Sequence, residues 1–255
     1  MNIKLAFRLA RITFHVTEGL LTTTFLFPWL SEASRNRHTR RWSRALLAMC
    51  GVSIEVPHVE ASLARTTVVA NHVSWLDIFV INAVHPCRFV AKAEIRAWPI
   101  LGWLADKAGT VFIARGNRRD LRLIFKGLVT RLENGERVAF FPEGTTASQG
   151  TLLPFHANLF EAAIDARASV QPCALRYVDA GGALHHSVDF IGDMTFADSM
   201  MGILAGPPIR AQLMWLAPID ATGTHRRDLA EATHRAVAAA LNVAPAAAAS
   251  ASALA

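Results

Sequence analysis

The chain has 255 residues, of which 52% are hydrophobic and 18% are charged, and its formal net charge is +6. So apolar a composition is unusual for a freely soluble enzyme and indicates apolar surface that a membrane would cover. Eight lysines and arginines but only three glutamates lie in residues 1–58, so most of the net charge is there. The remainder is nearly neutral, which argues against nucleic-acid binding. The basic end favours anionic lipid headgroups, with a solvated basic helix as the alternative.

The first predicted element is a helix over residues 4–30, where apolar residues recur every three or four positions. Its most apolar part, 19–30, contains three threonines and is too short to span a bilayer. We expect this helix to lie in the membrane interface. A single span and, with less support, a signal peptide are the alternatives. A second helix at 36–50 carries arginines on one side and apolar residues on the other.

From residue 52 onward, short β-branched runs alternate with helical patterns. The runs predict strands at 52–57, 66–70, 88–91, 110–114, 137–141 and 170–177, and the helical patterns lie at 74–84, 119–134 and 158–168. This alternation predicts an α/β fold with a mostly parallel central sheet flanked by helices, whose sites form at the carboxyl ends of the strands. Two later runs are expected to add edge strands, at 186–191 and 210–216, and a closing helix follows at 225–241.

Three regions follow from this pattern. Residues 1–51 form a pair of membrane-associated helices, residues 52–241 form the α/β domain, and residues 242–255 are an alanine-rich tail that we expect to be disordered.

The segment VVANHVSWLDIFV carries the first candidate site. His72 would lie in the turn after a strand and Asp77 in the first turn of the next helix, so their side chains can meet. A carboxylate on one ring nitrogen fixes the tautomer and raises the basicity of the other nitrogen, as a general base requires. The alternative is purely structural: the spacing of Ser74 and Asp77 is that of a capping box, and His72 would then be an ordinary loop histidine.

Two further strand ends carry polar residues. After a buried strand, Pro142 prevents another ladder bond and Gly144 permits close approach of the backbone to a ligand. Glu143 would accept a hydrogen bond from a substrate hydroxyl or hold a neighbouring cation. Arg115, at the end of the strand at 110–114, is a candidate for that cation and for binding phosphate, although a lone arginine is more often a surface residue.

In combination, these features resemble the four ordered motifs of the glycerolipid acyltransferase family, in particular its bacterial PlsC-type branch of 1-acyl-sn-glycerol-3-phosphate acyltransferases. The resemblance covers roughly residues 66–178. It consists of Asn71-His72-x4-Asp77, Phe112-Ile-x-Arg115, Phe141-Pro-Glu-Gly-Thr145 and a strand with Pro172. The segment from Lys92 through Pro99 to Gly102-Trp103 is also similar to the family's sequence between its first two motifs.

The resemblance implies that His72 deprotonates the acceptor hydroxyl, that Asp77 orients His72, and that no acyl-enzyme forms. It implies substrate-binding roles for Lys92, Arg115, Glu143, Gly144 and Thr145. The expected reaction moves a fatty acyl group from acyl carrier protein or CoA to the hydroxyl of 1-acyl-sn-glycerol-3-phosphate, giving phosphatidic acid. The thioester is a co-substrate, and no cofactor or metal is expected.

The family also docks on the membrane through an N-terminal helix pair, which matches residues 4–50. The resemblance therefore implies membrane lipids as partners and a peripheral or monotopic position on the cytoplasmic face of a bacterial inner membrane.

The chain departs from the family's pattern in one loop. Where the family commonly has arginine and serine after the Gly-Thr pair, this chain has Thr146-Ala147-Ser148, and where Phe-Lys-x-Gly is usual it has Phe155-His156-Ala157-Asn158. Two expected cations near the acceptor headgroup are missing or weakened. A similar loop occurs in family members that acylate lyso-ornithine lipid, whose headgroup has no phosphate, so this lipid is the alternative acceptor.

Other classes are disfavoured. The chain has no GxSxG elbow of a serine hydrolase and no P-loop or GxGxxG of a nucleotide-binding enzyme. The three cysteines have no paired spacing, so we expect small core residues and neither a zinc site nor a disulfide. The alternative outside enzymes is an inactive membrane lipid-binding protein with the same fold.

Overall fold

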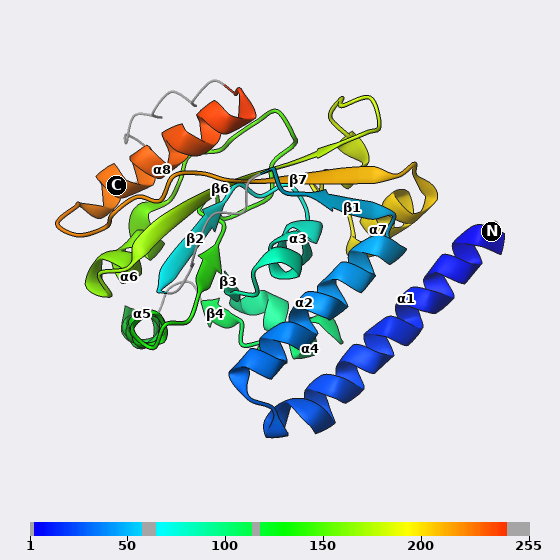
Figure 1. Ribbon diagram of the computed structural model, residues 1–255, viewed down its shortest axis with the longest axis horizontal. Helices are drawn as coiled ribbons and strands as arrows, with labels where there is room; N and C mark the ends of the chain where they lie inside the picture. Colours follow the sequence, from blue (N-terminus) through cyan, green and yellow to red (C-terminus); the bar gives the residue numbers. More distant parts are fainter. Residues whose placement is uncertain (1–2, 58–64, 114–117, 244–255) are drawn as a thin grey trace.

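One seven-stranded sheet organises the chain, with the strand order β1-β7-β6-β2-β5-β3-β4 (Figure 1). This computed structural model describes residues 3–57, 65–113 and 118–243. The strands are β1 (Val52–Glu55), β2 (Thr66–Ala70), β3 (Arg88–Lys92), β4 (Val111–Ile113), β5 (Val138–Phe140), β6 (Ser169–Val178) and β7 (Ile209–Trp215). Every neighbouring pair is parallel except β6 and β7. The predicted α/β fold with a mostly parallel sheet is confirmed.

Of the two expected edge strands, the one at 210–216 forms, as β7, but not at an edge, and the one at 186–191 does not form. β7 is an interior strand, because it pairs with β1 on one side and with β6 on the other. The run at 186–191 is not a strand but contains the short helix η5 (His186–Val188). Its backbone is used elsewhere: the Phe190 amide donates to the Val73 carbonyl at 3.1 Å, in the loop that follows β2. Whether a strand lies at the edge of a sheet depends on which strands pair with it. The hydrophobic pattern of a single segment does not carry that information.

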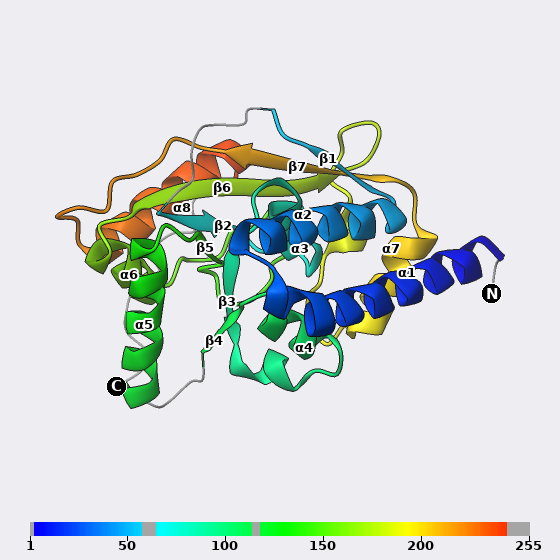
Figure 2. The same ribbon diagram turned by 60° about the horizontal axis from the view of Figure 1, so that its bottom comes forward.

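Helices cover both faces of the sheet (Figures 1 and 2). The helices α2 (Glu32–Met49), α3 (Leu76–Val84) and α7 (Phe196–Ala205) share a core with the strands on one face. On the other face lie α5 (Arg118–Glu133), α6 (Phe160–Asp165) and α8 (Arg226–Leu241). The sequence did not predict α7, nor η3 (Ala93–Ala97) and α4 (Leu101–Lys107), and the short η4 (Ala157–Leu159) precedes α6.

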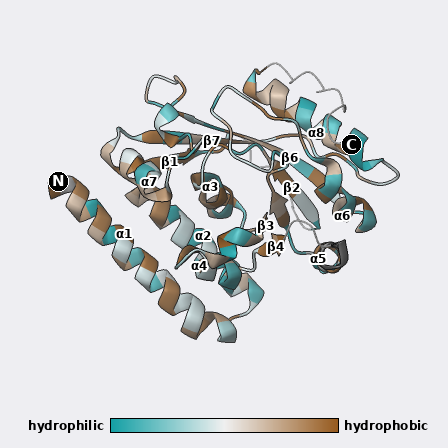
Figure 3. Cartoon of the chain, turned by 180° about the vertical axis from the view of Figure 1, so that it is seen from behind, coloured by the Kyte–Doolittle hydropathy of each residue, from teal (hydrophilic) through white to brown (hydrophobic). Residues whose placement is uncertain are grey.

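A helix over residues 4–30 was predicted, but the observed N-terminal helix does not run unbroken to residue 30. α1 (Ile3–Leu21) is followed by the π-helical turn η1 (Thr22–Leu26) and by η2 (Phe27–Trp29). The Thr23 hydroxyl donates to the Gly19 carbonyl at 2.8 Å, and such back-bonding bends helices. Figure 3 shows apolar residues interleaved with polar ones along α1. Among the described residues, no helix combines the length and the apolar character that a membrane crossing needs.

α1 is held on α2 by a reciprocal pair of hydrogen bonds. His15 Nε2 lies 3.0 Å from the Trp42 carbonyl, and Trp42 Nε1 donates to the His15 carbonyl at 3.1 Å. The two rings stack with their centroids 4.6 Å apart. α2 in turn buries Leu46 and Leu47 in the core it shares with the sheet. The predicted tail lies outside the described residues from 244 onward.

Gly19 permits this close approach, because a Cβ there would lie 2.7 Å from Trp42 Nε1. We expect Gly19→Ala to lower the free energy of unfolding by about 1–3 kcal/mol through overpacking, despite the better helix propensity of alanine. The matched control is Gly127→Ala in α5, where a Cβ would meet nothing within 4 Å and a gain of about 0.5–1 kcal/mol is expected. Chemical denaturation measures both variants. Equal effects would refute the packing argument.

Candidate active site

The candidate site begins where β2 ends. The β2–β6 ladder stops at Ala70, opposite Cys173. The buried side chain of Asn71 then continues the pairing, since its Nδ2 donates to the Leu175 carbonyl and its Oδ1 accepts from the Leu175 amide, both at 2.8 Å. An amide side chain thus takes the place of a backbone unit and fixes the start of the following turn.

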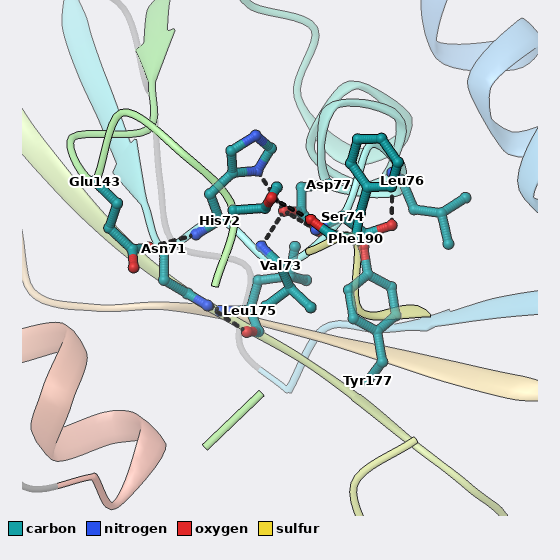
Figure 4. Close-up of polar contacts among 11 residues, drawn as sticks. Asn71, His72, Val73, Ser74, Leu76, Asp77, Glu143, Leu175, Tyr177 and Phe190 are labelled. Atoms are coloured by element: carbon teal, nitrogen blue, oxygen red, sulfur yellow. Dashed lines mark hydrogen bonds and ion pairs between the residues drawn. The ribbon is translucent and has the colours of Figure 1, made fainter. Parts of the chain in front are cut away.

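His72 and Asp77 meet in that turn (Figure 4). His72 Nδ1 lies 2.8 Å from Asp77 Oδ2, and the Asp77 carboxylate is fully buried. The same oxygen accepts from the amides of Val73 at 2.7 Å and Ser74 at 3.0 Å. The structural and functional interpretations of this spacing are therefore compatible, because one carboxylate both caps the turn and contacts the imidazole.

His72 presents its other nitrogen to a cavity. An ionised carboxylate only accepts hydrogen bonds, so the hydrogen of neutral His72 lies on Nδ1 and the lone pair lies on Nε2. Among the described residues, Nε2 has no hydrogen-bond partner, and the imidazole lines the cavity. The ring stacks on Phe141, with centroids 4.0 Å apart and planes 6° apart. This arrangement leaves a fixed base facing open space.

Glu143 lies behind this turn. Its Oε1 accepts from the His72 amide at 2.7 Å and its Oε2 accepts from the Leu153 amide at 2.9 Å. The side chain is buried, and burial raises the pKa of the Glu143 carboxyl to about 7, although the two amides oppose that rise. Glu143 is not among the described residues that line the cavity. The structure therefore places Glu143 as a tie between two loops.

The other predicted substrate-binding residues are distributed along the cavity. Gly144 and Thr145 line it directly, and Gly144 has a φ of 69°, where a side chain is strained and a Cβ would lie 3.3 Å from the His156 ring. Lys92 lines it from the exposed end of β3. Arg115 lies outside the described residues.

The loop that departs from the family's pattern is anchored by hydrogen bonds from its side chains, although Thr146 also lines the cavity. The Thr146 hydroxyl donates to the Phe190 carbonyl. The Ser148 hydroxyl lies 2.5 Å from Asp189 Oδ2, and Gln149 donates to the His185 carbonyl at 3.1 Å. These side chains hold the segment 185–190, so the loop supplies structural contacts where the family commonly has a cation.

The cavity itself has a volume of about 1910 Å³. This is about twice the upper end of the range for single-ligand pockets, about 1,000 Å³. Its apolar lining comes from η2, α2, α3, α4 and α7 and from residues beside them, with aromatic side chains that include Phe27, Trp42, Trp75, Phe79, Trp98 and Phe196. Lys126, Glu161 and Arg226 lie on the side of α5, α6 and α8. A long apolar chain and a polar group can therefore occupy the same cavity.

Sequence reasoning missed Tyr177, whose hydroxyl donates to Asp77 Oδ1 at 2.6 Å. The one available signal was that this is the only tyrosine of the chain. The three cysteines are free and buried, as predicted.

Comparison with known proteins identifies the family. The profile of the family described as Acyltransferase matches residues 54–176. A 1-acyl-sn-glycerol-3-phosphate acyltransferase of Neisseria meningitidis is 47% identical over 58% of this chain, a match that spans only 59% of that protein. A lyso-ornithine lipid O-acyltransferase of Pseudomonas aeruginosa is 40% identical over 80% of this chain and 78% of that protein.

The fold also has a solved counterpart. The crystal structure of the 1-acyl-sn-glycerophosphate acyltransferase PlsC from Thermotoga maritima has a TM-score of 0.67 over 94% of both chains, at 19% identity. The fold, the geometry at His72 and Asp77, and the extent of these matches lead to one conclusion. This chain belongs to the acyltransferase family.

Proposed function

We propose that this protein is a lysolipid O-acyltransferase that moves a fatty acyl group from a thioester, carried by acyl carrier protein or CoA, to a lipid hydroxyl. The observation that carries the proposal is the His72–Asp77 contact at 2.8 Å beside a cavity of about 1910 Å³ with apolar walls. A base alone would suit many reactions, but a base in a large cavity with apolar walls suits the transfer of an acyl chain.

In the proposed mechanism, Nε2 of His72 removes the proton of the acceptor hydroxyl. The hydroxyl oxygen attacks the thioester carbonyl and forms the ester bond, and the carbon–sulfur bond breaks. The imidazolium then returns its proton to the departing thiolate. Asp77 holds the ring in place and stabilises its positive charge.

Direct transfer is favoured over an acyl-enzyme. Cys87 lines the cavity, but burial raises the pKa of its thiol to about 12, so it stays protonated and is a poor nucleophile. Its Sγ also lies 3.1 Å from the His85 carbonyl. No covalent step through this residue is proposed.

The first candidate acceptor is 1-acyl-sn-glycerol-3-phosphate, with phosphatidic acid as the product. Lys92 and Arg115 are the cations we assign to its phosphate, and Gly144 and Thr145 would approach the headgroup from the opposite loop. The second candidate is lyso-ornithine lipid. It is favoured by the loop at 146–158, in which Thr146 and His156 line the cavity at the two positions where the family commonly has cations.

We expect His72→Ala to reduce transfer by a factor on the order of 10²–10⁴, the usual contribution of a general base, without altering folding. The assay offers each lysolipid with each thioester donor and reads the products by mass spectrometry. Circular dichroism of the variant controls for folding. Wild-type turnover by the variant would exclude His72 as the base, and no product from any pairing with the wild type would favour an inactive lipid-binding protein.

Glu143 was predicted to bind substrate, and we now assign it a positioning role. In Glu143→Gln one oxygen becomes an amide donor that faces a backbone N–H, so we expect a loss of about 1–3 kcal/mol of stability. The pKa of Glu143 rises from 4.5 to about 7 on folding, because burial disfavours its charge. Wild type should therefore lose stability relative to the variant as pH rises from 4.5 through 7. Denaturation at several pH values measures this difference, and a constant difference would contradict it.

The proposed location is the cytoplasmic face of a bacterial inner membrane, with the protein peripheral or monotopic. Supporting this, α1, η1 and η2 expose large apolar side chains, namely Ile3, Phe7, Phe14, Leu21, Phe25 and Trp29. Trp98 and Trp103 are exposed beside and within α4, which contacts α1 and η1. Aromatic residues with nearby cations are typical of the membrane interface. Arg11 is one such cation, 5.8 Å from the Phe7 ring.

We expect the double variant Phe25→Ser and Trp29→Ser to bind vesicles of phosphatidylglycerol and phosphatidylethanolamine at least about tenfold more weakly, since burying one large apolar side chain contributes about 1.5–3 kcal/mol. The control is Leu123→Ser, which alters an apolar side chain on α5 that is as exposed as Phe25. Vesicle co-sedimentation measures the binding. A similar loss in the control would show that the docking surface lies elsewhere.

A further inference from the structure

Tyr177 reaches the candidate site because β6 is longer than the strand beside it. β2 ends at Ala70, opposite Cys173, whereas β6 continues to Val178. At about 3.3 Å per residue, Tyr177 lies roughly 13 Å beyond the last paired residue, over the turn that joins β2 to α3. Side chains alternate along a strand, so Tyr177 shares the face of Cys173 and Leu175, and all three belong to the core under α3.

The Tyr177 hydroxyl has one target. It donates to Asp77 Oδ1 at 2.6 Å, whereas His72 and the amides of Val73 and Ser74 all contact Oδ2 (Figure 4). Among the described residues, Tyr177 is the only hydrogen-bond donor to Oδ1. Without that donor, one oxygen of a fully buried carboxylate would have no partner, and burying such an oxygen unpaired is costly.

The donor is fixed in position. The Tyr177 amide donates to Gln149 Oε1 at 2.6 Å, and the Tyr177 carbonyl accepts from the His185 amide at 2.9 Å. The ring is fully buried, and burial raises the pKa of Tyr177 well above its ordinary range, so the hydroxyl keeps its hydrogen. A short hydrogen bond from a clamped, always-protonated donor constrains both the rotamer and the charge of its acceptor.

We propose that Tyr177 is a positioning residue that holds the Asp77 carboxylate in its orientation, and thereby sets His72 for proton removal. Tyr177 does not line the cavity among the described residues, so it acts through Asp77 and not on the substrate. The inference rests on the proposed acyl transfer. It adds a residue from β6 to the His72–Asp77 pair, which otherwise lies within one turn.

The pH dependence follows from the groups around Asp77. The titratable groups that face it are His72, Tyr177 and, at longer range, Glu143, which senses the Asp77 charge. Removing the hydroxyl takes away a donor that favours the deprotonated His72–Asp77 pair. The pair then takes up a proton at higher pH, so the acid limb of kcat moves to higher pH.

The first test is Tyr177→Phe, which keeps the ring and removes only the hydroxyl. We expect kcat to fall about 10-fold to 100-fold, the equivalent of one charge-assisted hydrogen bond, with KM within about twofold of wild type and the acid limb moved upward. The control is Thr233→Val, which removes a buried hydroxyl in α8 that donates to the Leu229 carbonyl. It should affect stability alone. An unchanged kcat and pH profile in a folded Tyr177→Phe would overturn the proposal.

A second test does not depend on turnover. Because Tyr177 is the only tyrosine, growth on 3-fluorotyrosine labels this position alone. We expect a single fluorine resonance that shifts with pH in wild type and loses that shift in His72→Ala. A resonance that titrates identically in both proteins would show that Tyr177 is not coupled to His72. If the wild type transfers no acyl group, the proposed function fails, and this resonance still decides the role of Tyr177.

Discussion

The buried carboxylate of Asp77 is the interaction on which the catalytic end of the sheet depends. It accepts from the imidazole of His72, from two amides of its own turn and from the hydroxyl of Tyr177. A buried charge is tolerated only when its lone pairs are satisfied, and these four donors come from the turn after β2 and from β6. The Asp77 carboxylate, which orients His72 for the proposed reaction, therefore also connects the turn after β2 to β6 in the sheet.

A second carboxylate has a different task in the same region. Asp77 contacts a side chain that faces the cavity, whereas the hydrogen-bond partners of Glu143 within the described part of the chain are the backbone amides of His72 and Leu153. Glu143 links the loops that follow β2 and β5, which are neighbouring parallel strands. The two acidic residues thus differ in their partners. Asp77 orients the His72 ring, and Glu143 orients the backbone that carries this ring.

The N-terminal helices and the catalytic turn share one cavity. Trp42 and Phe27 line it from the helix pair, and His72 lines it from the sheet. The N-terminal segment that exposes the surface proposed to meet the membrane therefore also forms part of the wall of the space that His72 faces. On the other side, side chains of the loop at 146–149 form hydrogen bonds with the segment 185–190.

The sequence by itself determined the features that depend on neighbouring residues. β-branched runs marked β2 and β6 closely, and the spacing of His72 and Asp77 within one turn was enough to predict that they meet. The sequence did not settle whether Asp77 caps the turn or orients the His72 ring. Only the structure showed that one oxygen of Asp77 contacts both the turn amides and the ring. The place of β7 inside the sheet, the backbone partners of Glu143 and the contact of Tyr177, 100 positions after Asp77, required the tertiary structure. The physical reason is that hydrogen bonds between distant segments depend on strand order and strand length, which no local pattern of residues specifies.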